Sequence, residues 1–190
     1  MDARRERTRT AILNAFVELL SEKSYGTITV ADLLARAGVG RTTFYAHFRS
    51  KDDVLAAQVA AICSHALEPT QAGGEVPQDP AAEVERILAN LHDRENGLRA
   101  IVAGEGSERF ADVLRHEIVA RAKRNIPEHP SGPAGSMNRE FLAHHIGASF
   151  VGMVRWWAWS NFASTPHELA RDYLAAILPL FENTAGSGGE

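Results

Sequence analysis

Residues 27–55, TITVADLLARAGVGRTTFYAHFRSKDDVL, contain the signals that decide the fold of this 190-residue chain. Thr29 and Asp32 have the spacing of a capping box, in which each side chain accepts a hydrogen bond from the other residue's backbone N–H. A short helix should therefore begin at Val30. The Gly-Val-Gly run at residues 38–40 ends it, because a glycine can adopt the positive φ of a tight turn. The pattern predicts two short helices joined by a turn.

The second of these helices should bury one side and expose the other. Phe44 and Phe48 are four residues apart, so they share the inward face. The remaining residues suit a surface laid into a DNA major groove, since Arg forks onto guanine, Thr reaches bases or phosphates, and Tyr and His reach phosphates. These outward residues are Arg41, Thr42, Thr43, Tyr45, Ala46 and His47. Lys51, at the start of the next helix, is placed for a phosphate.

Residues 37–55, AGVGRTTFYAHFRSKDDVL, resemble the DNA-binding signature of the TetR/AcrR family of transcriptional regulators. The resemblance extends over residues 9–55, and the Phe-Tyr-x-His-Phe core and the following Ser-Lys fall at the family spacing. It implies a helix-turn-helix domain that binds double-stranded operator DNA, and a C-terminal domain that forms a homodimer and binds a small-molecule effector. By position it assigns DNA contacts to Thr29, Arg41, Thr43, Tyr45, His47 and Lys51, to which the outward-facing Thr42 is added.

Two further features bear on this resemblance. Gly40 stands where the family usually has a Ser N-cap, a role that Gly can fill. Over residues 141–178, a tryptophan-rich segment followed by Thr-Pro-His-Glu-Leu resembles one common C-terminal subclass of the family.

The rest of the chain is predicted to be all-α, since its periodic segments have the helical period and no useful alternating strand pattern occurs. Helices are expected at about residues 4–24, 51–67, 81–94, 96–103, 108–124 and 138–160, with a last one opened by the start signals Thr165, Pro166 and Glu168. Proline-rich and glycine-rich segments at 68–80 and 125–137 are interpreted as loops. The predicted domains are a helix-turn-helix at 1–50, an effector-binding and dimerisation domain at 51–183, and a disordered tail at 184–190.

Charge and composition narrow the function. Residues 1–55 carry nine Lys and Arg against seven Asp and Glu, whereas the whole chain has a net charge of −4. A phosphate-binding surface would therefore be confined to the N-terminal part. Four arginines at positions 4, 5, 7 and 9 fit such a surface or a solvated arm. The single Cys63 excludes an intramolecular disulfide and suits the cytoplasm, and no apolar run is long enough to span a membrane.

No catalytic constellation is visible in the sequence, which has neither a glycine-rich phosphate loop nor a nucleophile elbow. We therefore expect that the protein is not an enzyme and that it binds neither a cofactor nor a metal ion. His144 and His145 are a poor ligand pair, because adjacent helical residues point about 100° apart. Trp156, Trp157 and Trp159 are interpreted as packing residues at a helix-bundle interface.

The effector is expected between the middle helices and the long helix, and should tilt the helix that starts at Lys51 and joins the two domains. Helical faces alone select Ile62, Leu91, Phe110, Leu114, His144 and Phe150 as ligand-binding residues. The long helix and the last helix should pair with their symmetry mates in the homodimer. The acidic, mainly apolar domain favours an apolar or cationic ligand.

Three classes of function remain open. The first is a ligand-responsive repressor acting on a palindromic operator, with activation as a variant. The second is an architectural DNA binder, which would need broader basic charge than the acidic C-terminal part offers. The third is a small-molecule-binding helical protein, or an enzyme, that does not use its helix-turn-helix for DNA. Unchanged DNA affinity in a Tyr45→Ala variant would favour the third.

Overall fold

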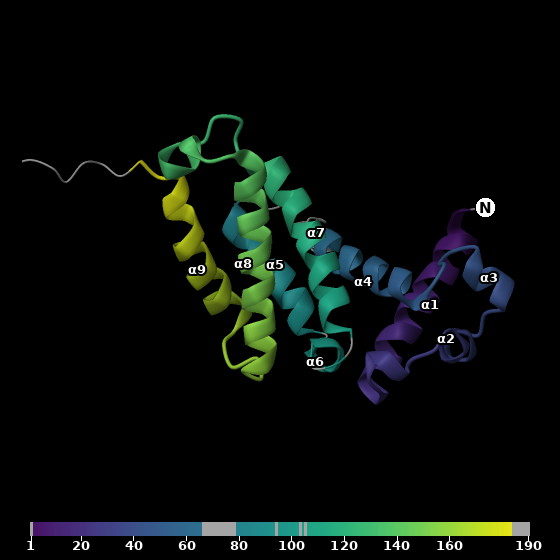
Figure 1. Cartoon of the computed structure of the whole chain (residues 1–190). Helices are drawn as coiled ribbons and strands as arrows, with labels where there is room; N and C mark the ends of the chain where they lie inside the picture. Colours follow the sequence, from purple (N-terminus) through teal and green to yellow (C-terminus); the bar gives the residue numbers. More distant parts are fainter. Residues whose placement is uncertain (1, 66–78, 94, 103, 105, 184–190) are drawn as a thin grey trace, which may run out of the picture.

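The computed structural model describes residues 2–65, 79–93, 95–102, 104 and 106–183, and all regular elements within these residues are helical (Figure 1). The all-α prediction is therefore confirmed for the described part of the chain. The predicted disordered tail at 184–190 and most of the predicted loop at 68–80 lie outside these residues. Within the described residues, no helix is both long and apolar enough to cross a bilayer.

The first three helices form a small N-terminal unit. They are α1 (Asp2–Glu22), α2 (Val30–Ala37) and α3 (Arg41–Tyr45), with a 3-10 turn, η1 (Tyr25–Thr27), between α1 and α2. The apolar face of α1 packs against α2, because its apolar residues recur at three- and four-residue spacing. The buried side chains of this unit are Ile12, Ala15, Phe16, Leu19, Leu20, Tyr25, Ile28, Leu33, Phe44 and Phe48.

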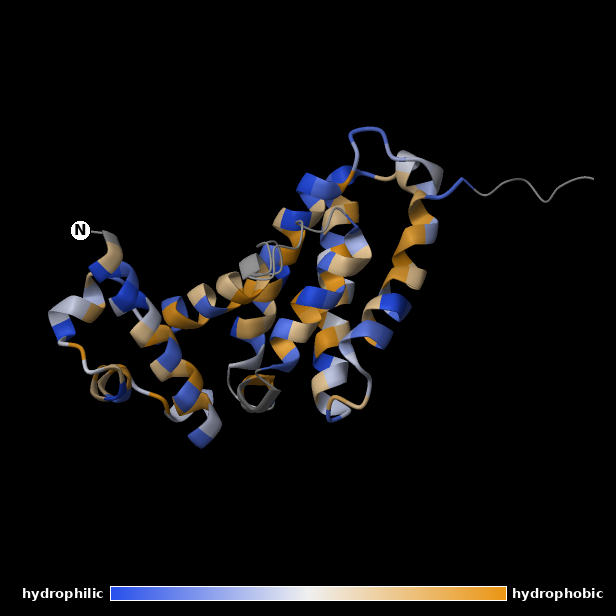
Figure 2. Cartoon of the chain, turned by 180° about the vertical axis from the view of Figure 1, so that it is seen from behind, coloured by the Kyte–Doolittle hydropathy of each residue, from blue (hydrophilic) through white to orange (hydrophobic). Residues whose placement is uncertain are grey.

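One helix, α4 (Lys51–His65), leads from this unit into a larger bundle, as Figure 1 shows. The bundle comprises α5 (Pro80–His92), α6 (Glu95–Val102), α7 (Ser107–Asn125), α8 (Arg139–Trp159) and α9 (Pro166–Ile177), with 3-10 turns η2 (Gly132–Ser136) and η3 (Leu178–Phe181). α7 packs along α8, α9 packs against α5, and α4 contacts both α5 and α7. Hydrophobic residues recur along each of these helices (Figure 2), and most of their buried side chains belong to one hydrophobic core cluster.

The start signals in the sequence correspond to real caps. Thr29 and Asp32 form the predicted capping box of α2, and Thr165 and Glu168 form that of α9. Gly38 follows α2 with a φ of 65°, the left-handed conformation that the tight turn needs. The two capping boxes determine where α2 and α9 begin, and Gly38 determines where α2 ends.

The structure moves several predicted boundaries. α1 begins at Asp2, two residues earlier than expected, and already ends at Glu22. α5 begins at Pro80, the last residue of the predicted loop at 68–80; Asp79 caps the helix and Pro fits its first position, where no N–H bond is needed. The predicted loop at 125–137 contains the 3-10 turn η2.

The three tryptophans of α8 have different environments. Trp157 is fully buried, packs edge-on against Phe162, and its indole N–H donates to the Ser164 carbonyl at 2.8 Å. Trp156 and Trp159 are exposed by 53% and 64%. Only Trp157 packs in the core of this protomer, so the interpretation of all three as packing residues needs a partner surface for the other two.

Candidate nucleic-acid interface and effector cavity

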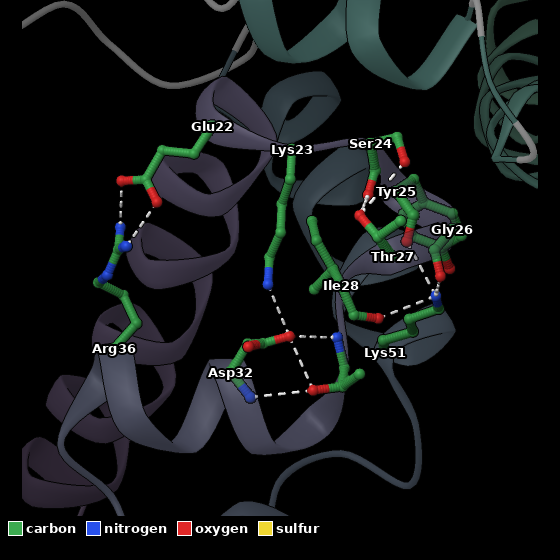
Figure 3. A network of polar contacts seen from close by, with 11 residues as sticks. Glu22, Lys23, Ser24, Tyr25, Gly26, Thr27, Ile28, Asp32, Arg36 and Lys51 are labelled. Carbon is green, nitrogen blue, oxygen red and sulfur yellow. Dashed lines mark hydrogen bonds and ion pairs between the residues drawn. The ribbon is translucent and has the colours of Figure 1, made fainter.

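The N-terminus of α2 is held by a polar cluster that also uses Thr29. The Asp32 carboxylate accepts from the Thr29 backbone N–H at 2.8 Å and from its hydroxyl at 2.7 Å, and pairs with Lys23 at 2.8 Å (Figure 3). The bond to Lys23, followed by those to Thr29, holds the pKa of Asp32 well below its usual value. The Thr29 hydroxyl, predicted to contact DNA, therefore has a capping function within the fold.

The orientation of α3 follows from two buried rings. Phe44 is fully buried and Phe48 nearly so, with their centroids 6.0 Å apart. The opposite side of the helix is open to solvent, and Tyr45 is 49% exposed. The other exposed residues are Arg41, Thr42, Thr43 and Ala46, and His47 is partly buried. The residues of α3 that are predicted to contact bases and phosphates therefore lie on one accessible surface.

Lys51 has a different position from the one expected. Its ammonium donates to the carbonyl oxygens of Tyr25, Gly26 and Ile28, at 2.9, 3.2 and 3.0 Å (Figure 3). The Tyr25 hydroxyl in turn donates to the carboxylate of Asp52. An ammonium has three N–H donors, and all three are used here. A phosphate contact by Lys51 would require it to give up one of these bonds, so its main role in this structure is to join α4 to the turn before α2.

The first turns of α1 lie next to the exposed side of α3. Arg4, Arg5 and Thr8 line the same shallow hollow as Thr42, Thr43, Ala46 and His47 of the α3 region. The Arg9 guanidinium lies 5.1 Å from the centre of the Phe48 ring, which fixes α1 over the end of α3. Arg4 and Arg5 were not among the predicted site residues, although the run of arginines was the signal that could have identified them.

A cavity of about 270 Å³ lies among α5, α7, α8 and α9. Most of its wall is apolar, and its polar residues gather where α5 begins and α7 ends. The apolar lining residues include Val84, Ile87, Ile118, Ala122, Ile126, Ile146, Phe150, Leu174 and Ile177. Tyr173 also lines it, but its hydroxyl donates to the Ile146 carbonyl at 2.9 Å, and burial raises the pKa of Tyr173 to about 12. This is a concave, apolar site of the kind that holds small molecules.

A buried ion pair forms the polar end of the cavity. The Arg121 guanidinium donates to Glu83 at 3.0 Å and to the backbone carbonyl of Cys63 in α4. Asn125 donates to the second oxygen of Glu83 at 3.1 Å. Burial also raises the pKa of the nearby Cys63 thiol to about 12, so it stays protonated at neutral pH. Helices α4, α5 and α7 therefore meet at one guanidinium.

The predicted ligand-binding residues are divided by the structure. Phe150 lines the cavity, whereas Ile62, Leu91 and Phe110 line a separate hollow of about 30 Å³. Leu114 is fully buried and lines neither. The placement of His144 in a pocket is corrected, because its side chain is 61% exposed on the outer side of α8. Helical periodicity identified buried positions but not which of them border empty space, and it missed Glu83, Arg121 and Asn125.

The outer side of α8 is an exposed face rich in aromatic and small residues. Phe141, Trp156 and Trp159 are exposed large side chains on it. A Cβ added at the exposed Gly152 would meet no atom within 4 Å. The other exposed residues of this stripe are His145 and Ala148. We refer to Phe141, His145, Ala148, Gly152, Trp156 and Trp159 as the α8 face.

Among the described residues, no group of three or more His, Cys, Asp or Glu side chains could hold a metal ion.

The sequence profile described as bacterial regulatory proteins, tetR family, matches residues 12–58, which run from α1 into α4. The chain is 23% identical over 175 residues to the HTH-type transcriptional regulator YxbF of Bacillus subtilis, covering 92% of this chain and 45% of YxbF. It is 28% identical to the HTH-type transcriptional repressor LfrR of Mycolicibacterium smegmatis, covering 73% of this chain and 76% of LfrR.

A solved TetR transcriptional regulator from Streptococcus agalactiae superposes with a TM-score of 0.60 at 25% identity, covering 93% of this chain and 96% of that one. The fold, the helix-turn-helix and these relatives all point to the same group of regulatory proteins. Residues 12–58 therefore form a helix-turn-helix segment of the tetR family of bacterial regulatory proteins, and the chain has the fold of a solved TetR transcriptional regulator.

Proposed function

We propose that this protein is a homodimeric transcriptional repressor that binds a palindromic operator through α3 and responds to a small molecule in the cavity of the helical bundle. In this proposal residues 1–50 bind DNA, and residues 51–183 bind the effector and the second copy. The observation that carries it is the division of residues 41–48, which are α3 and the turn after it: Phe44 and Phe48 are buried, whereas Arg41, Thr43 and Tyr45 are exposed together. Repression follows the relative LfrR, which is named a repressor.

The exposed side of α3 has the chemistry that DNA recognition needs. Arg41 stands in its first turn, from which a recognition helix reads bases, and can fork onto a guanine edge. Thr42 and Thr43 follow it with hydroxyl and methyl groups. Arg4 and Arg5, from the neighbouring start of α1, would add phosphate contacts that position the domain without reading sequence.

The α8 face supports dimerisation. Exposed aromatic rings are enriched at protein interfaces, and an exposed glycine lets a second helix approach closely. A two-fold axis through this face would pair Trp156 and Trp159 of one copy with the same stripe of the other. Such a dimer would set two recognition helices about 34–36 Å apart, one helical turn of DNA, which is the origin of the expected palindrome.

Selection from a random duplex library with the purified full-length chain tests this proposal. We expect enrichment of a two-fold symmetric site at moderate salt. A matched Arg41→Ala/Tyr45→Ala variant should stay a folded dimer and lose the enrichment, because both residues are exposed. Failure of the wild-type protein to enrich any sequence would contradict operator binding, and enrichment of a single half-site would contradict the dimer.

A further inference from the structure

The cavity in the bundle has one polar end inside an otherwise apolar wall. Arg121 is only 6% exposed, and it lines the cavity together with Glu83 and Asn125. The ion pair between Arg121 and Glu83 is itself buried, with side-chain exposures of 8% and 12%. A buried charge pair is costly unless its hydrogen bonds are satisfied, so any unmet donor or acceptor in it indicates what a ligand could supply.

The unmet group in this pair is a donor. Both carboxylate oxygens of Glu83 have partners, one in Arg121 and one in Asn125. The Nε of Arg121, by contrast, is buried without a hydrogen-bond acceptor among the described residues. A guanidinium carries five N–H donors and accepts nothing. The polar end of the cavity therefore has a free hydrogen-bond donor, and a ligand that binds there should supply an acceptor.

The charge at this end is already balanced. Arg121 and Glu83 cancel each other, and the surrounding wall is made mostly of hydrocarbon side chains. A carboxylate ligand would be repelled by Glu83, and an ammonium ligand by Arg121, and each would add a third charge to a poorly hydrated space. An uncharged acceptor meets the donor without that penalty.

We propose that the cavity binds a small uncharged molecule with an apolar body and a carbonyl oxygen that accepts a hydrogen bond from Arg121. The volume of about 270 Å³ lies just below the range of about 300–1,000 Å³ typical of drug-sized ligands, so the molecule is small. This class differs from the apolar or cationic ligand that the net charge of the domain suggested. Local pairing, and not net charge, determines what the cavity accepts.

Arg121 also links the cavity to α4. Its other terminal nitrogen donates to the carbonyl of Cys63, two residues before α4 ends at His65. The opposite end of α4 carries Lys51, which bonds the turn before α2. A ligand that draws the guanidinium toward the cavity weakens the bond to Cys63 and frees one end of the helix that joins the two parts of the molecule. This step rests on the proposed function as an effector-responsive regulator.

Four phenylalkyl probes of similar size test the ligand class by isothermal titration of the full chain without DNA. They are 4-phenylbutan-2-one, butylbenzene, 3-phenylpropanoate and 4-phenylbutan-2-amine. We expect the ketone to bind about tenfold or more tightly than butylbenzene, because it adds a hydrogen bond to a charged donor, and more tightly than either ion. Equal binding of butylbenzene, tighter binding of an ion, or no binding of the ketone would overturn the proposal.

Two variants assign the preference to Arg121. Glu83→Gln/Arg121→Met removes both charges at once, so that no buried ion is left unpaired. We expect it to keep butylbenzene binding and lose the preference for the ketone. If the double variant is unfolded, Arg121→Lys replaces it in the test. This variant keeps the charge but loses the planar guanidinium, and should reduce the preference for the ketone over butylbenzene. An unchanged ketone preference in the variant that folds would overturn the assignment.

The same ketone on the selected operator tests the link to α4. We expect it to change the wild-type DNA affinity about fivefold or more and to leave that of the Glu83→Gln/Arg121→Met variant unchanged. An equal response in both proteins would refute the link. If the wild type binds the ketone but no operator, the proposed function fails and the ligand class stands. If it binds operator but not the ketone, the ligand class alone fails.

Discussion

Helices α3 and α8 both bury aromatic rings on one side and expose them on the other, but their exposed surroundings differ. Tyr45 of α3 stands among Arg41 and threonines, whereas Trp156 of α8 shares its face with Phe141 and Gly152. An arginine and hydroxyls can form hydrogen bonds with bases and phosphates, and rings beside a glycine suit close packing against an apolar partner. An exposed aromatic residue therefore indicates a partner, and its neighbours indicate which kind.

The largest expected effect comes from placing a charge in the middle of the α8 face. Gly152→Arg should leave the protomer folded, because Gly152 is exposed and a Cβ there would meet nothing within 4 Å beyond its chain neighbours and the adjacent backbone of its own helix. In the dimer it would put two arginines against apolar surface near the two-fold axis. We expect a monomer in sedimentation, with operator affinity at least about a hundredfold lower, since the two half-sites are no longer bound together.

His116→Arg is the matched control for this variant. It adds the same side chain at an exposed helical position on α7, away from the α8 face. It should remain a dimer and bind the operator normally. A dimeric Gly152→Arg protein, in contrast, would show that the α8 face is not the dimer interface and would leave the exposure of Trp156 and Trp159 without a partner.

The corresponding change on α3 should act on DNA alone. Arg41→Ala should weaken operator binding by about 1–3 kcal/mol and relax the preference at one base position of each half-site, while the dimer persists. Binding to a panel of single-base operator variants would measure both effects. Uniform weakening over all sequences would instead make Arg41 a phosphate contact.

This difference between the helices also explains what the sequence could predict. Around α3 the signals are local: the Thr29–Asp32 box, the turn at Gly38 and the spacing of Phe44 and Phe48 all lie within twenty residues. Around α8 they are not. Its sequence is apolar over most of the circumference, and Trp157 is buried, while Trp156 is exposed, only because His92 of α5 and Phe162 pack against Trp157.

The cavity among α5, α7, α8 and α9 is even harder to predict from local sequence patterns. The pair of Glu83 and Arg121 joins residues 38 positions apart, and the cavity walls come from four helices. Hydrophobic periodicity marks Phe150 and Leu114 alike as buried, yet only Phe150 borders the empty space. Cavities are what remains after packing, so they follow from the arrangement of helices and not from any one of them.

A smaller effect is expected from the start of α1, which would extend the polar surface of α3. Arg4→Gln/Arg5→Gln should lower the slope of log affinity against log salt by about three to four for the dimer, at about 0.9 for each of four lost phosphate contacts. Base preference should not change. Arg124→Gln, an exposed arginine at the end of α7, is the control and should leave the slope unaltered. A double variant with the wild-type slope would make these arginines a solvated arm.

Lys51 has one role in the sequence-based prediction, a phosphate contact, and another in the structure, the attachment of α4 to the turn before α2. If Lys51 binds phosphate, Lys51→Met should lower the salt slope by about two for the dimer. The structure favours another result, because the ammonium already bonds three carbonyl oxygens and lies 4.5 Å from the centre of the Tyr25 ring.

We expect Lys51→Met to reduce the unfolding free energy by about 1–3 kcal/mol, since it leaves carbonyl groups without a donor, and to weaken operator binding equally at every salt concentration. Urea unfolding and a salt titration of the same protein separate the two roles. Parallel salt lines with lower stability would identify Lys51 as the residue that positions α2 and α3 for DNA. A flatter line with unchanged stability would return it to the list of phosphate contacts, and α4 would then touch the DNA backbone directly.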